Sequence, residues 1–142
     1  MTERYRPPSF TLQELVPPTI FNRLGEKAWD LLNEDALRSL QALRDKFGPI
    51  TVNNWHSGGA FKESGLREAE TKTGAPKSAH KRGEAFDCKP RAVTVREMYD
   101  YIVAHGEEFP LIRRLENIAF AKTWVHFDVV NHAGRGIRVF NP

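Results

Sequence analysis

The segment from Thr123 to Val130 brings a histidine and an aspartate to one face of a predicted β-strand. Side chains alternate along a strand, so Trp124, His126 and Asp128 share one face and the apolar residues between them share the other. The apolar face suits packing against helices, which leaves an imidazole and a carboxylate together on the opposite face. Exposed sheet faces also carry polar residues for solubility alone. This strand by itself is therefore compatible with a functional site or with an ordinary solvent-exposed face.

A second histidine and aspartate lie seven residues apart in the middle of the chain. His80 and Asp87 flank Gly83, a residue that permits a tight turn. With His126 they offer two imidazoles and one carboxylate, a three-ligand set with an open fourth position. That arrangement is typical of a catalytic zinc ion, which acidifies its bound water and polarises a carbonyl. The alternative is that His80 and Asp87 only hydrogen-bond within a loop.

The elements that would position these residues follow from periodicity and turn signals. Helices are expected over 34–47, after the N-cap Asn33, and from the capping box Thr94–Glu97 onward. Residues 20–32 could be helical, and 56–83 form a long loop. Strands are expected over 50–55, 84–89, 115–120, 123–130 and 137–140, the last three as a β meander. This order predicts an α+β fold, with a small, mainly antiparallel sheet and helices packed on one face.

Composition limits the classes of protein to which this chain could belong. The 142 residues predict a single domain over 1–142, with a proline-rich N-terminal segment over 1–20. Lys and Arg total 21 against 18 for Asp and Glu, and this mild excess suits a polyanionic partner such as nucleic acid or cell wall without requiring one. One cysteine excludes an internal disulfide and a four-cysteine zinc site.

The residues around the first histidine form a more specific pattern. Ser-x-His-x-x-Gly-x-Ala-x-Asp, followed by Trp-x-His-x-Asp, resembles the D-alanyl-D-alanine zinc metallopeptidase family of the hedgehog/DD-peptidase fold. Its members are bacterial and phage enzymes that cut the peptide stems of peptidoglycan. The resemblance covers roughly residues 34–130, and the matching positions are Ser78, His80, Gly83, Ala85 and Asp87, with an upstream Ser-Gly-x-Arg at 64–67.

The resemblance implies that zinc is bound by His80, Asp87 and His126. It also implies that Arg67 bonds the substrate carbonyl or the oxyanion, where such donors are worth several kcal/mol. The implied partner is a peptidoglycan stem peptide, with no nucleic acid and no membrane insertion.

One position departs from the family pattern. Many members carry an acidic general base three residues before the last histidine, where this chain has Thr123, which cannot act as a base at neutral pH. A hairpin centred on Ala121 would instead place Glu116 opposite His126, unless the turn shifts by one residue. We expect Glu116 to be the base and Asp128 to orient a ligand histidine, with Asp128 as the other candidate base.

The leading hypothesis is therefore a zinc-dependent peptidase of the D,D-carboxypeptidase or endopeptidase (endolysin) type. The alternative is a catalytically inactive cell-wall-binding or phage structural module that retains the fold. A metal-dependent nuclease ranks last, because hard cations need more carboxylates than this pattern offers. The N-terminus has no apolar signal region, so we expect a protein that is cytoplasmic on synthesis and is then phage-borne or released to the cell wall.

Overall fold

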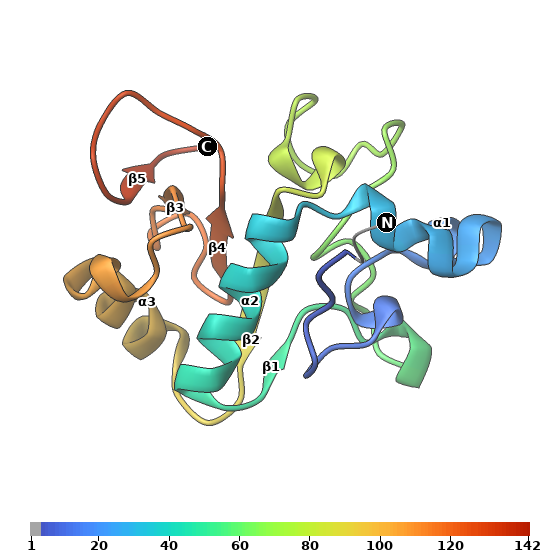
Figure 1. The fold of residues 1–142 in the computed structure, drawn as a ribbon, viewed down its shortest axis with the longest axis horizontal. Helices are drawn as coiled ribbons and strands as arrows, with labels where there is room; N and C mark the ends of the chain where they lie inside the picture. The colour runs from blue at the N-terminus through green and yellow to red at the C-terminus, as the bar shows by residue number, and fades with distance from the viewer. Residues whose placement is uncertain (1–3) are drawn as a thin grey trace.

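The computed structural model describes residues 4–142, which form three α-helices and a five-stranded sheet (Figure 1). The helices are α1 (Pro18–Leu24), α2 (Glu34–Phe47) and α3 (Val95–Ala104). The strands are β1 (Ile50–Thr51), β2 (Ala85–Pro90), β3 (Arg114–Glu116), β4 (Val125–Asp128) and β5 (Arg138–Phe140). The fold is α+β, as predicted, and no helix within residues 4–142 is long and apolar enough to cross a membrane.

The sheet has the strand order β1-β2-β4-β3-β5. All neighbouring pairs are antiparallel except β3 and β5, which are parallel. The prediction of a terminal β meander is therefore wrong in its last step. Both edges of β4 are already occupied, by β2 and β3, so the returning chain pairs instead with the free edge of β3, where it runs in the same direction as that strand.

Alternation along the strands divides the sheet into an apolar face and a polar face. Figure 1 shows α2 lying across β2, and α3 contacts both β2 and β4. The side chains that the strands contribute to this buried cluster are Ile50, Phe86, Cys88, Leu115, Val125 and Phe127, and those of the two helices include Leu37, Leu40, Leu43, Met98 and Ile102. Residues with the opposite orientation, including Asp87 and His126, are left for the other face.

The two strongest helices begin where the sequence predicts. The Asn33 side chain accepts a hydrogen bond from the backbone N–H of Ala36 at 3.1 Å, capping α2. At α3 the capping box is complete: the Thr94 hydroxyl accepts from the backbone N–H of Glu97, whose carboxylate accepts from the Thr94 N–H. These caps satisfy N–H groups that have no partner within the helix.

Several other elements are shorter than expected. The predicted helix over 20–32 divides into α1 and a 3-10 segment, Gly25–Leu31. The predicted strand over 50–55 ends at Thr51, because the side chains of Asn53 and Trp55 both donate to the carbonyl of Val16 and draw the chain away from the sheet. Val16 lies in the proline-rich N-terminal segment and is fully buried.

Gly83 occupies a position that only glycine fits, at the turn between the long loop and β2. Its φ is +69°, and a Cβ there would lie 2.1 Å from the carbonyl oxygen of Leu31. Its own carbonyl accepts a hydrogen bond from the backbone N–H of Asn33, the cap of α2. The turn that leads from His80 to Asp87 is therefore hydrogen-bonded to, and packed closely against, the start of α2.

We expect Gly83→Ala to lower the free energy of unfolding by about 3 kcal/mol, measured by urea denaturation. The matched control is Gly58→Ala, which has a φ of +89° but no atom within 4 Å of the added Cβ. That variant should lose only about 1 kcal/mol, the cost of a left-handed alanine. Equal losses in the two variants would contradict the packing argument.

Candidate metal centre

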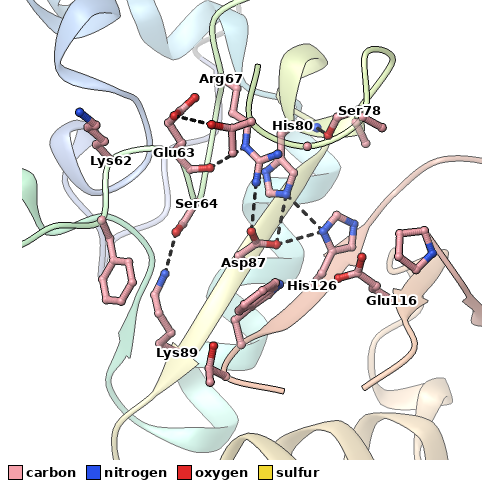
Figure 2. Close-up of a pocket in the computed structure, with 18 of the residues that line it drawn as sticks. Lys62, Glu63, Ser64, Arg67, Ser78, His80, Asp87, Lys89, Glu116 and His126 are labelled. Atoms are coloured by element: carbon pink, nitrogen blue, oxygen red, sulfur yellow. Dashed lines mark hydrogen bonds and ion pairs between the residues drawn. The ribbon is translucent and has the colours of Figure 1, made fainter. Parts of the chain in front are cut away.

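Three potential ligand atoms converge on the polar face of the sheet (Figure 2). His80 Nε2 lies 3.1 Å from Asp87 Oδ1 and 3.2 Å from His126 Nδ1, and the latter two atoms are 3.0 Å apart. Ligands bound at about 2.0–2.2 Å to one tetrahedral ion stand roughly 3.3–3.6 Å from each other. All three residues are buried. The group could hold a metal ion with little rearrangement.

Sheet pairing supplies two of the three atoms. Asp87 on β2 and His126 on β4 are direct partners in the antiparallel ladder. Their neighbours Phe86 and Phe127 are paired in the same way and point into the core. Because side chains alternate, burying these two phenylalanines forces the aspartate and the histidine onto the opposite face, next to each other.

A short 3-10 turn, Ala79–Arg82, supplies the third atom. The Ser78 hydroxyl caps this turn by accepting from the backbone N–H of His80 at 3.2 Å. Gly83 ends the turn, and its N–H donates to the His80 carbonyl. In the sequence pattern, Ser78 is thus the cap of the turn, His80 is the candidate ligand and Gly83 ends the turn.

The outer nitrogen of each imidazole has a partner that can only accept. His80 Nδ1 donates to the carbonyl of Gly65 at 2.9 Å, and His126 Nε2 donates to Asp128 Oδ2 at 3.1 Å. These bonds keep a hydrogen on the outer nitrogen and direct the other nitrogen of each ring toward the centre. Such supporting bonds orient ligands and raise their basicity.

Asp128 is in turn held by a residue that the sequence analysis did not single out. The guanidinium of Arg114 donates two hydrogen bonds of 2.8 Å to the two oxygens of this fully buried carboxylate. Burial would raise the pKa of Asp128, but the bonds from His126 and Arg114 lower it below its ordinary value. A signal was available, because the hairpin register expected from the sequence places position 114 opposite 128, as observed.

Arg67 lies against the ligand set from the side of the long loop. Its Nε donates to the carbonyl of Glu63 at 2.7 Å, and its Nη2 donates to Asp87 Oδ2 at 3.3 Å. Burial would raise the pKa of Asp87, but the adjacent His80 and His126 hold it well below its usual range. Arg67 therefore lies beside the ligand set and contacts the Asp87 carboxylate oxygen that is not bonded to the two histidines.

Glu116 lies beside His126, at the end of β3. The observed pairs Arg114↔Asp128 and Leu115↔Phe127 have the register expected for a hairpin centred on Ala121. Figure 2 shows the half-buried Glu116 carboxylate next to the His126 ring. Burial raises the pKa of Glu116; the proximity of His126 lowers it, that of Asp87 raises it, and the result is above the ordinary value.

Five of the residues proposed from the sequence line a cleft of about 650 Å³, namely Arg67, His80, Asp87, Glu116 and His126. One wall is the long loop over residues 60–80, and the other is formed by the ends of β3 and β4 with the C-terminal Phe140. Thr123 and Trp124 line the second wall. The six residues proposed from the sequence therefore gather in one place, His80, Asp87 and His126 in the centre and Arg67, Glu116 and Asp128 around it.

Comparison of the chain with protein-family models, with curated proteins and with solved structures found no match. The function is therefore inferred from the geometry and chemistry of this centre.

The affinity of the centre for a metal ion should depend on pH through His126. Burial alone would lower the pKa of His126, but its bonds to Asp128 and Asp87 raise it to about 9. A bound cation must displace that proton. Between pH 7 and 9 the affinity for Zn²⁺ should therefore rise by about tenfold per pH unit and then level off. Titration in a metal-buffered solution would measure this, and an affinity independent of pH over that range would contradict it.

Proposed function

We propose that this protein is a zinc-dependent peptidase that hydrolyses peptide-stem bonds of peptidoglycan. The observation that carries the proposal is the convergence of His80, Asp87 and His126 at the base of a cleft that also holds Glu116 and Arg67. The resemblance of the motif around these residues to D-alanyl-D-alanine zinc peptidases supports the choice of substrate. The proposal has three parts: the metal, the proton transfer and the substrate.

The donor set favours zinc over other cations. Two imidazoles and one carboxylate with an open position are typical of catalytic zinc, whereas magnesium and calcium prefer sites made of oxygen ligands. Zinc held by His80, Asp87 and His126 would supply an acidified water and polarise the scissile carbonyl.

Glu116 is the group placed to move the proton. Its raised pKa brings the carboxylate closer to the working range of a general base at neutral pH. It would accept a proton from the attacking water and later deliver it to the leaving amine. Thr123, which lines the same cleft, has no group able to accept a proton at this pH.

Arg67 and Asp128 have supporting roles. Arg67 keeps N–H donors beyond its bonds to Glu63 and Asp87, and these would bond the carbonyl oxygen as negative charge develops there. Asp128 is a positioning residue: fully buried behind His126, it fixes the ring whose Nδ1 faces the centre.

The alternative is a wall-binding module that keeps the metal site without catalysis. The observation in its favour is Thr123, which stands where many members of the resembling family carry an acid. The two proposals differ in turnover, because the module would bind zinc and stem peptide but release no product.

Two variants separate proton transfer from metal binding. Glu116→Gln should retain about one zinc per chain and lose at least about 100-fold in the rate of stem-peptide hydrolysis. Asp128→Asn should instead weaken zinc affinity by about 10- to 100-fold. Product release would be followed by chromatography, and zinc by elemental analysis.

The outcomes are distinct. Full activity of Glu116→Gln with zinc bound would remove Glu116 as the base. A zinc-loaded wild-type protein that binds stem peptide but never cleaves it would favour the binding module over the peptidase.

A further inference from the structure

Lys89 lies in the same cleft and has no role in the scheme above. It follows Asp87 by two positions on β2, so the two side chains share a face, with Cα atoms about 7 Å apart. Figure 2 shows the Lys89 ammonium on the same side of β2 as the Asp87 carboxylate, directed toward Ser64. It lines the cleft together with Phe61 and Ser64.

The ammonium has only neutral partners. Its Nζ donates to the Ser64 hydroxyl at 2.7 Å and lies 4.0 Å from the centre of the Phe61 ring. Among residues 4–142, no carboxylate oxygen lies within the 4.0 Å that defines an ion pair with this nitrogen. A lysine ammonium has three donors, so donors remain for a ligand in the cleft.

The position of Lys89 is fixed by its surroundings. The Ser64 N–H donates to the Asn53 side chain at 2.9 Å, and the Ser64 carbonyl accepts from the Asp87 N–H at 2.7 Å. Ser64 is thereby tied to the strand that carries the metal ligand. The hydroxyl holds Nζ at a set distance from the centre without neutralising its charge.

Leaving a half-buried ammonium without an ion-pair partner costs free energy, which an incoming anion would offset. The carboxylate of Glu63, the residue before Ser64, is engaged by the hydroxyls of Thr71 and Thr73. One residue of an extended peptide spans about 3.5 Å. The separation along β2 therefore suits a carboxylate within about one or two residues of the bond held at the centre.

We infer that Lys89, with Ser64 and Phe61, forms a subsite for a carboxylate of the substrate, close to the scissile bond. This inference rests on the proposed function for the substrate class. The carboxylate is either the C-terminal carboxylate of the stem or a free carboxylate on an internal acidic residue of the stem. Both carboxylates would bind the Lys89 ammonium in the same way, and the choice of peptide distinguishes them.

The test uses three N-acetylated stem pentapeptides ending in D-Ala-D-Ala. One has every carboxylate amidated, one keeps only the C-terminal carboxylate, and one keeps only the internal carboxylate. Binding is measured by calorimetry on zinc-loaded Glu116→Gln protein, and hydrolysis is measured on zinc-loaded wild type. Binding of the first peptide measures the affinity of the cleft for a substrate that has no carboxylate.

One of the two single-carboxylate peptides should bind about 10- to 100-fold more tightly than the fully amidated peptide. Lys89→Met should abolish that preference while leaving the affinity for the amidated peptide unchanged, and Lys89→Arg should keep it. Lys62→Met is the matched control, because Lys62 is an exposed lysine lining the same cleft, and it should retain the preference. Lys89→Gln replaces Lys89→Met if circular dichroism shows that the latter is unfolded.

Equal binding of all three peptides, binding of none, or a preference that survives loss of Lys89 would overturn the subsite. Cleavage of the peptides without a carboxylate preference would do so while leaving the peptidase proposal intact. Conversely, a Lys89-dependent preference in binding with no cleavage of any peptide by wild type would support the subsite and contradict the peptidase.

Discussion

Asp87 and His126 face each other across the antiparallel pair β2–β4, and this pairing sets the position of the other groups in the centre. It is enforced from the opposite side of the sheet, where Phe86 and Phe127 are fully buried. A shift of one residue would expose these rings and bury the polar set. The hydrophobic core therefore maintains the geometry of the candidate metal site, although none of its atoms belongs to the site.

The charged side chains on the polar face of the sheet form a continuous chain of bonded partners. Arg114 pairs with Asp128, which holds His126; His126 faces Asp87, and Asp87 is bonded by Arg67. Each buried carboxylate thus has one guanidinium and at least one imidazole as partners. Removing a single member would leave a buried charge with fewer partners, which costs more than the lost pair is worth. This chain of side chains borders the cleft, where a cation and a substrate would bind.

The residues of the site were more predictable from the sequence than the lengths of the elements. Strand alternation alone places His126 and Asp128 on one face, and a symmetric hairpin gives the observed register of β3 and β4. The same register implied Arg114 opposite Asp128, but the sequence alone does not show that Asp128 is buried and needs this partner. Lys89 was missed for a similar reason, since its neutral surroundings come from Phe61 and Ser64, far away in sequence.

Two of the predictions that failed concern the edges of the sheet. The ends of β1 and the direction of β5 are decided by tertiary contacts, namely the bonds of Asn53 and Trp55 to Val16 and the occupied edges of β4. No local pattern of residues encodes such contacts. By contrast, the capped helices α2 and α3 carry their boundaries in their own sequence, through Asn33 and the Thr94–Glu97 box.

The central claim is that His80, Asp87 and His126 together bind one zinc ion, and zinc content measures it most directly. Elemental analysis would compare the wild-type protein with His126→Ala, both purified without added metal and both checked for folding. We predict about one zinc per wild-type chain and a loss of that zinc in the variant. A folded wild-type protein that contains no zinc and takes up none on titration would contradict the account.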